Sequence, residues 1–147
     1  MIVKSILKTK ARGAGVVTID PGASIADAAR MLANHRIGAV IAVDATGAIK
    51  GILSERDIVR GLAQSDTICT EAKVSDLMTA TVLTCHEDDS VDSLMKTMTA
   101  KRIRHLPVVG AAGELTGMVT IGDVVKSRLD EMDMEVDNLR HYVATAR

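Results

Sequence analysis

The sequence predicts an α+β fold in which two pseudo-symmetric β-α-β-β-α repeats pack face to face, followed by a C-terminal helix. The chain matches itself at an offset of 66 residues, without a gap, from Val16–Arg60 to Val82–Lys126. In both copies the spacing of apolar residues changes between helical and strand periods at the same places. Because a unit of about 60 residues buries little core alone, the two copies are expected to pack against each other.

Each copy is predicted to begin with a short strand, 16–19 or 82–85, that ends in turn residues. A helix follows, opened by Ser24 or Ser90. Its apolar residues recur at i, i+3, i+4 and i+7, which predicts one buried helix face. That face comprises Ile25, Ala28, Ala29 and Leu32 in the first copy and Val91, Leu94, Met95 and Met98 in the second.

The second half of each copy is predicted to be a hairpin followed by a helix. The apolar runs 39–43 and 106–109 are too short for helices and suit buried strands. Short loops containing glycine lead from them into strands 49–53 and 115–119, which predicts antiparallel pairing. A second helix is then expected to start near Ser54 or Thr120.

An additional segment before each repeat also recurs, because residues 3–7 resemble residues 74–78. The spacing to the next strand is longer in the first copy, and a flexible loop at 11–15 is predicted to account for it. The expected domains are residues 1–66, residues 67–127 and a C-terminal amphipathic helix at 128–147.

Composition excludes several classes of function. The chain has 47% hydrophobic and 25% charged residues and a net charge of −1, which is typical of a globular protein and favours neither nucleic acid nor an anionic membrane. Tyr142 is the only aromatic residue, so bases of single-stranded nucleic acid have no stacking platform. The core must therefore be aliphatic.

No catalytic or metal-binding pattern is found in the sequence. Cys69 and Cys85 are too far apart for a zinc knuckle, and His86 beside Cys85 does not complete a ligand set. No histidine lies in a catalytic motif, and no phosphate loop is present. We therefore expect no enzymatic activity and no metal. Lone thiols, with no signal peptide or spanning segment, predict a cytoplasmic protein.

The sharpest local pattern closes each repeat: Gly, two apolar residues, a hydroxyl, two variable positions and Asp. It occurs at Gly51–Asp57, with Ser54, and at Gly117–Asp123, with Thr120. One interpretation is a capping box that satisfies the first N–H groups of a helix. The other is a ligand site, because a helix N-terminus attracts phosphate and a carboxylate accepts ribose hydroxyls. The two interpretations are compatible.

Together with the segment Ile103-Arg104-His105-Leu106-Pro107-Val108-Val109, the duplicated unit resembles a tandem pair of cystathionine β-synthase (CBS) domains, or Bateman module, over residues 3–127. The resemblance implies a non-catalytic regulatory module that binds an adenosine-containing ligand between the repeats. AMP, ADP, ATP and NAD(H) are the expected ligands, and S-adenosylmethionine ranks below them. The alternative is a ligand-free module for interaction or dimerisation.

The resemblance also implies roles for individual residues. Asp57 and Asp123 would hold ribose, with Ser54 and Thr120 beside ribose or phosphate. Adenine would lie against Thr18, Ile19, Thr84, Cys85, Val40 and Leu106. The phosphate candidates are Arg104, His105, Arg36, Arg102 and Arg56.

Two of these phosphate candidates have simpler explanations. Arg104 would otherwise be a solvated surface charge, and His105 a satisfied core histidine. Only the second repeat has Arg104-His105-x-Pro107, since Gly38, Ala39 and Ile41 stand opposite. Two unequal sites are therefore expected.

After Asp123 the helical pattern continues. Apolar residues recur at alternating steps of four and three, the spacing of a coiled-coil seam: Val125, Leu129, Met132, Val136, Leu139 and Val143. This stripe either packs back on its own domain or pairs with another chain. CBS pairs commonly assemble as flat dimers, so the resemblance favours a homodimer. The regulated partner would be a separate protein.

Overall fold

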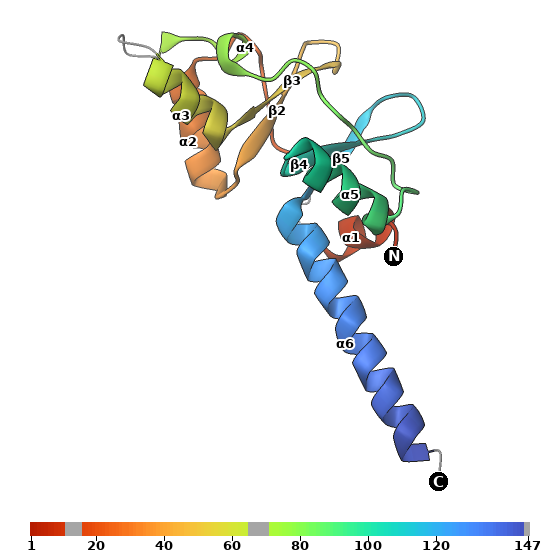
Figure 1. The fold of residues 1–147 in the computed structure, drawn as a ribbon. Helices are drawn as coiled ribbons and strands as arrows, with labels where there is room; N and C mark the ends of the chain where they lie inside the picture. The colour runs from red at the N-terminus through yellow and green to blue at the C-terminus, as the bar shows by residue number, and fades with distance from the viewer. Residues whose placement is uncertain (11–15, 65–70, 146–147) are drawn as a thin grey trace.

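The structure, a computed structural model, describes residues 1–10, 16–64 and 71–145. The loop predicted at 11–15 lies outside these residues. The elements run in the order α1 (Val3–Thr9), β1 (Thr18–Ile19), α2 (Ile25–His35), β2 (Ala39–Val43), β3 (Ile49–Ser54), α3 (Glu55–Gln64), α4 (Val74–Leu77), α5 (Val91–Lys101), β4 (His105–Val109), β5 (Leu115–Thr120) and α6 (Ile121–Thr145) (Figure 1). The predicted α+β fold of two repeats and a C-terminal helix is confirmed.

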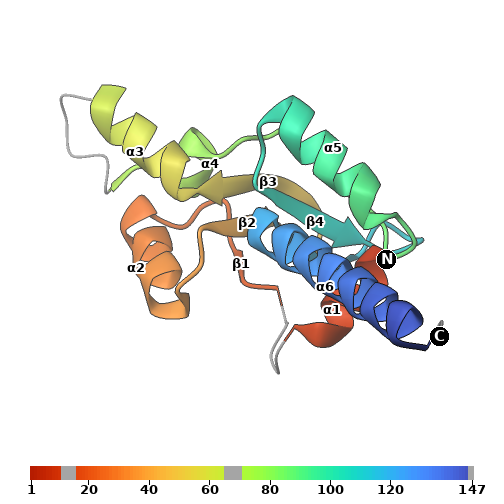
Figure 2. The ribbon, with the colours of Figure 1, turned by 60° about the horizontal axis from the view of Figure 1, so that its bottom comes forward.

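The strands form one small sheet in each repeat. In the first, β2 pairs in parallel with β1 and antiparallel with β3. In the second, β4 pairs antiparallel with β5, and Cys85 alone bridges Val108 in parallel. The strand predicted at 82–85 is therefore wrong in extent, because residues 82–84 lie toward the surface and only Cys85 enters the core. Figure 2 shows α2 and α3 on one side of the molecule and α5 and α6 on the other, with strands between them.

The first helix of each repeat begins as predicted. Ser24 Oγ accepts a hydrogen bond from the Asp27 N–H at 3.1 Å, and Ser90 Oγ accepts one from the Ser93 N–H at 3.1 Å. The predicted faces are buried or half-buried except at Ala29, which is exposed. Position 29 lies at the edge of the face, where the short methyl of alanine does not reach the core.

The short helices α1 and α4 are exchanged between the repeats. Val3 and Ile6 of α1 lie in the hydrophobic cluster of the second repeat, whereas Val74 of α4 lies in that of the first. The Val3 N–H donates to Asp89 O at 2.9 Å, and the Val74 N–H donates to Ala23 O at 2.8 Å. The predicted boundaries follow the chain and stay a prediction, whereas the packing joins each short helix to the other repeat.

This exchange explains the glycine that opens each closing motif. A Cβ atom on Gly51 would lie 2.5 Å from Met78 Sδ and 2.9 Å from Thr79 O, and one on Gly117 would lie 2.8 Å from Leu7 Cδ2. At Gly51 a Cβ atom would meet a backbone oxygen, whereas at Gly117 it would meet only the end of a flexible side chain. Each glycine lies where the segment from the other repeat crosses its strand, and the need for glycine is stronger at position 51.

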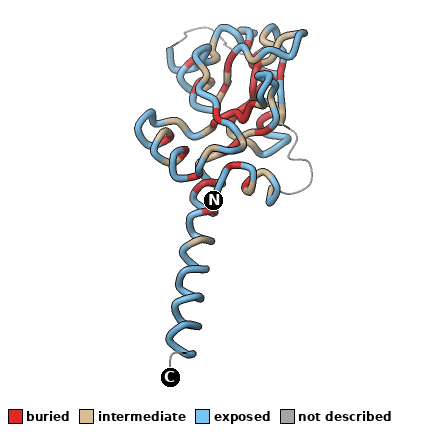
Figure 3. Tube along the Cα trace, turned by 90° about the vertical axis from the view of Figure 1, so that its right-hand side faces the viewer, coloured by how far each residue is buried: buried red, intermediate tan, exposed pale blue. Residues whose placement is uncertain are grey.

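Helix α6 extends well beyond the domain that it starts from (Figures 1 and 3). Val124 and Ser127 are buried, but the apolar stripe from Val125 to Val143 is exposed along its whole length. The interpretation that the stripe packs back on its own domain is therefore wrong. Among the described helices, α6 included, none combines the length and apolar character that crossing a membrane needs.

Candidate functional site

Two cavities lie where the repeats meet, and each is built from both repeats. The Asp123 cavity, of about 830 Å³, joins Thr120 and Asp123 of the second repeat to Val16 and Val17 of the first. The Asp57 cavity, of about 480 Å³, joins Ser54 and Asp57 to Val82 and Leu83. Each cavity thus combines the closing motif of one repeat with the first-strand segment of the other.

The closing motifs form capping boxes at the start of α3 and α6. The Ser54 N–H donates to Asp57 Oδ2 at 2.9 Å, and the Asp57 N–H donates to Ser54 Oγ at 3.2 Å. The Thr120 N–H donates to Asp123 Oδ2 at 2.9 Å, and the Asp123 N–H donates to Thr120 Oγ1 at 3.2 Å. The capping interpretation is confirmed. Because both pairs also line cavities, the cap directs a carboxylate and a helix N-terminus toward the same space.

Lys10 contacts the carboxylate of the Asp123 cavity. Its Nζ atom lies 2.8 Å from Asp123 Oδ2 and donates to Met118 O at 2.6 Å. The sequence analysis missed this residue. Lys10 follows α1, and no local sequence pattern indicates that α1 packs on the second repeat. The offset that aligns residues 3–7 with 74–78 places Thr81 opposite Lys10, and Thr81 lines the Asp57 cavity.

The Asp57 cavity has a different distribution of charge. Arg60 Nη1 lies 3.5 Å from Asp57 Oδ1, and Arg60 itself is exposed. The walls include three of the predicted phosphate candidates, Arg56, Arg102 and Arg104. Four guanidinium groups thus surround one cavity, which favours an anionic ligand.

Arg104 therefore lies with Asp57 of the other repeat and is exposed, as expected for a solvated charge. Although Arg104 and Asp123 belong to the same repeat, they line different cavities, because each cavity spans both repeats. Arg36, the remaining arginine candidate, lines the Asp123 cavity. Arg36 and Arg102 end α2 and α5 in the left-handed region, each with φ of 54°. The recurrence of arginine at this position thus coincides with a recurring backbone turn.

His105 lines both cavities. It packs against Gly38, where a Cβ atom would lie 3.3 Å from His105 Nε2. Burial lowers the pKa of His105; the nearby Arg104 and Lys10 act in the same direction, and Glu55 and Asp123 oppose it. His105 is thus a half-buried imidazole shared by both cavities.

None of the six adenine candidates lines either cavity. Val40, Leu106, Ile19 and Cys85 are buried in the two hydrophobic clusters, and Thr18 and Thr84 are exposed elsewhere. The cavity walls are formed instead by the residues just before them, at 16–17 and 82–83. Sequence spacing pointed to segments that reach the cavities, but it did not show which part of each segment turns inward to the core.

The thiol of Cys85 is buried in the hydrophobic cluster of the second repeat. Burial raises the pKa of Cys85 to about 12, so the thiol stays protonated near neutral pH. Within residues 1–10, 16–64 and 71–145, no three His, Cys, Asp or Glu side chains gather as a metal site would require.

Comparison with known proteins matches the two repeats to one family. The family model of the CBS domain matches residues 3–64 and 74–130. The chain is 34% identical over 124 residues to the mitochondrial CBS domain-containing protein CBSX3 of Arabidopsis thaliana. That match covers 82% of this chain but only 60% of the Arabidopsis protein.

Solved structures share the fold over most of the chain. The CBS-domain protein ATU1752 of Agrobacterium tumefaciens is 43% identical, with a TM-score of 0.81 over 86% of this chain and 92% of that one. The CBS domain pair of protein MJ0100, in complex with 5′-methylthioadenosine and S-adenosyl-L-methionine, is 33% identical, with a TM-score of 0.75 over 90% and 98%. The protein PAE2072 of Pyrobaculum aerophilum, complexed with AMP, is 26% identical, with a TM-score of 0.73 over 84% and 89%.

Proposed function

The chain belongs to the CBS domain family, and from that premise we propose that it is a non-catalytic regulatory module that binds an adenosine-containing ligand. One observation carries the proposal. Two cavities each place a capped aspartate and a helix N-terminus beside aliphatic side chains from the opposite repeat. Structures with this fold bind AMP or S-adenosyl-L-methionine.

In this proposal each part of a cavity recognises one part of the ligand. The Oδ1 atoms of Asp57 and Asp123 accept the ribose hydroxyls, because their Oδ2 atoms are engaged by the caps. Adenine packs against Val82 and Leu83 in one cavity and against Val16 and Val17 in the other. The helix N-termini and basic side chains bind phosphate.

The charges rank the ligands. The four arginines around Asp57 and the three basic residues Lys10, Arg36 and Lys126 around Asp123 favour AMP, ATP or NAD(H). They disfavour S-adenosylmethionine, whose sulfonium is cationic. The ligand would report energy or redox state in the cytoplasm to a separate partner protein.

Calorimetry with AMP, ATP, NADH and S-adenosylmethionine tests the proposal. Asp57→Asn and Asp123→Asn keep an oxygen for the cap but lose the charge, so each should weaken binding about tenfold or more. Asp76→Asn is the matched control, because Asp76 accepts from the Lys73 N–H at 2.9 Å to cap α4 and lines neither cavity. Absence of binding by all four ligands at millimolar concentration would overturn the proposal. Equal weakening by Asp76→Asn would refute the ribose assignment.

The exposed stripe of α6 supports a second candidate function, a ligand-free module for protein interaction. It predicts self-association or partner binding that does not change when nucleotide is added. Calorimetry on the same samples separates the two functions.

A further inference from the structure

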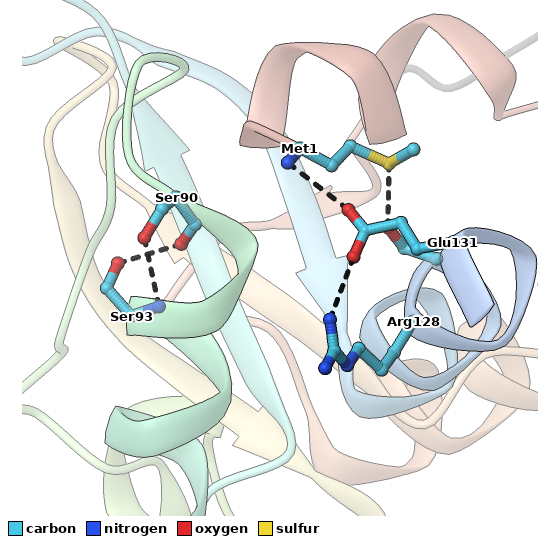
Figure 4. A network of polar contacts seen from close by, with 6 residues as sticks. Met1, Ser90, Ser93, Arg128 and Glu131 are labelled. Carbon is cyan, nitrogen blue, oxygen red and sulfur yellow. Dashed lines mark hydrogen bonds and ion pairs between the residues drawn. The ribbon is translucent and has the colours of Figure 1, made fainter. Parts of the chain in front are cut away.

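One side of helix α6 packs against the domain, and the apolar stripe on another side is exposed to solvent. The six stripe residues, Val125, Leu129, Met132, Val136, Leu139 and Val143, are each 46–63% exposed. On the side facing the domain, Ser127 Oγ contacts Met1 Sδ at 2.7 Å. Glu131 contacts the Met1 amino group at 3.2 Å and Arg128 at 3.1 Å (Figure 4). At 100° per residue, the centre of the stripe lies roughly a third of a turn from this side.

The stripe has the register of a coiled coil. Its alternating steps of four and three place Leu129, Val136 and Val143 at a positions, and Val125, Met132 and Leu139 at d positions. A lone helix would leave these side chains in water. A partner helix with the same repeat would bury them all.

The flanking charges identify that partner and its direction. In a parallel pair, each g residue faces the e residue five positions later on the partner. Arg128 then faces the partner's Asp133, and Glu135 faces the partner's Arg140, so both contacts join opposite charges.

An antiparallel pair of the same helices would bring e to e and g to g. Asp133 would then face the partner's Asp133, and Glu135 the partner's Glu135. Lys126 would face the partner's Arg140. All three contacts join like charges, which destabilises that orientation.

We propose that α6 forms a parallel, two-stranded coiled coil with a second copy of this chain, from Val125 to Val143. The proposal is independent of any nucleotide, because it depends only on α6. It places the two domains side by side at the same end of the coiled coil.

Charge exchange tests the partner by sedimentation velocity of the full chain. One variant carries Asp133→Lys and Arg140→Glu; the other carries Arg128→Glu and Glu135→Lys. In each alone, every g–e contact becomes repulsive, so self-association should weaken on the order of 100-fold. Mixed together, all contacts become attractive, and a one-to-one dimer should form. Asp137→Lys, at an exposed b position, is the control that should keep the native dimer.

Disulfide trapping tests the direction. Leu139→Cys should cross-link as a dimer, because d residues of a parallel pair face each other. Met134→Cys, at an exposed f position, should give no more cross-link than the native chain. A monomeric native chain, a dimer unaffected by charge exchange, or no cross-link at position 139 would each overturn the proposal. Circular dichroism verifies that the variants fold.

Discussion

The two cavities have the same backbone scaffold but different charged groups. Positions related by the 66-residue repeat line both: Ser54 and Thr120, Asp57 and Asp123, and the aliphatic pairs at 82–83 and 16–17. Several charged positions differ. Arg56 stands opposite Gly122, and Arg104 and His105 stand opposite Gly38 and Ala39. Lys10, which precedes the gapless part of the repeat, stands opposite Thr81.

The difference shows which features a duplication retains. The hydroxyl and the aspartate recur because they cap a helix and line a cavity at once. The side chains of Lys10 and Arg104 cap no helix in the described structure, although Lys10 donates to Met118 O. Each of them lines one cavity only, so such positions can set the charge of each cavity separately. The Asp57 cavity became rich in arginine, whereas the Asp123 cavity has a lysine paired with its carboxylate.

The largest expected effect tests whether the cavity walls have been assigned correctly. Leu106 is 1% exposed in a hydrophobic cluster, whereas Leu83 is 41% exposed and lines the Asp57 cavity. Leu106→Ala should lower the free energy of unfolding by about 3 kcal/mol, measured in urea. Leu83→Ala should change it by less than about 1 kcal/mol but weaken nucleotide binding. If Leu83→Ala left binding unchanged, the base would not lie at 82–83.

The next prediction compares Gly51 with Gly117, the two positions where a segment of the other repeat crosses a strand. A Cβ atom on Gly51 would meet the backbone oxygen of Thr79, which cannot move without disturbing its hydrogen bond with the Ile52 N–H. A Cβ atom on Gly117 would meet only the end of the flexible Leu7 side chain. Gly51→Ala should therefore destabilise the protein by about 2–3 kcal/mol and Gly117→Ala by about 1 kcal/mol. Equal losses in chemical denaturation would contradict this asymmetry.

A smaller effect is expected from Lys10, which lines only the Asp123 cavity. The ion pair of Lys10 and Asp123 is 2.8 Å long, with both side chains less than a third exposed. Lys10→Met should cost about 1 kcal/mol of stability and weaken ATP binding more than adenosine binding. The control is Lys8→Met, because Lys8 is an exposed lysine of α1, just before Lys10, and lines neither cavity. Losses of the same size in both variants would show that the contact with Asp123 contributes nothing.

The sequence predicted the repeats, the hairpins and the caps, because each follows from local spacing or from a short motif. It did not predict the exchange of α1 and α4. Val3 and Val74 are equally apolar, and apolar character alone does not indicate which hydrophobic cluster a residue joins. That exchange brought Lys10 to Asp123 and made the sites shared. The predicted adenine residues lie one or two positions away from the residues that line the cavities. Burial of Val40 and Leu106 depends on which side of each sheet the partner elements cover, and periodicity does not specify that side.

The smallest effect uses His105, the one titratable group among the described residues that lines both cavities. The pKa of His105 is lowered in the folded protein, chiefly by burial, below its ordinary value of about 6.5. The unfolded chain therefore binds the proton more readily, and stability must rise as pH increases through the window between the lowered pKa and about 6.5. His105→Gln should reduce this rise, measured as the free energy of unfolding in urea at pH 5.5 and 7.5.

The control for this experiment is His141→Gln, because His141 lies on the exposed part of α6 and lines neither cavity. It should leave the native pH dependence unchanged. An anionic phosphate bound beside His105 stabilises the imidazolium, so nucleotide should also reduce the rise in the native protein but not in His105→Gln. If nucleotide acts this way while Asp57→Asn or Asp123→Asn removes only part of the effect, His105 responds to both cavities. If one substitution removes all of it, a single cavity binds phosphate, and the two cavities differ in function as well as in charge.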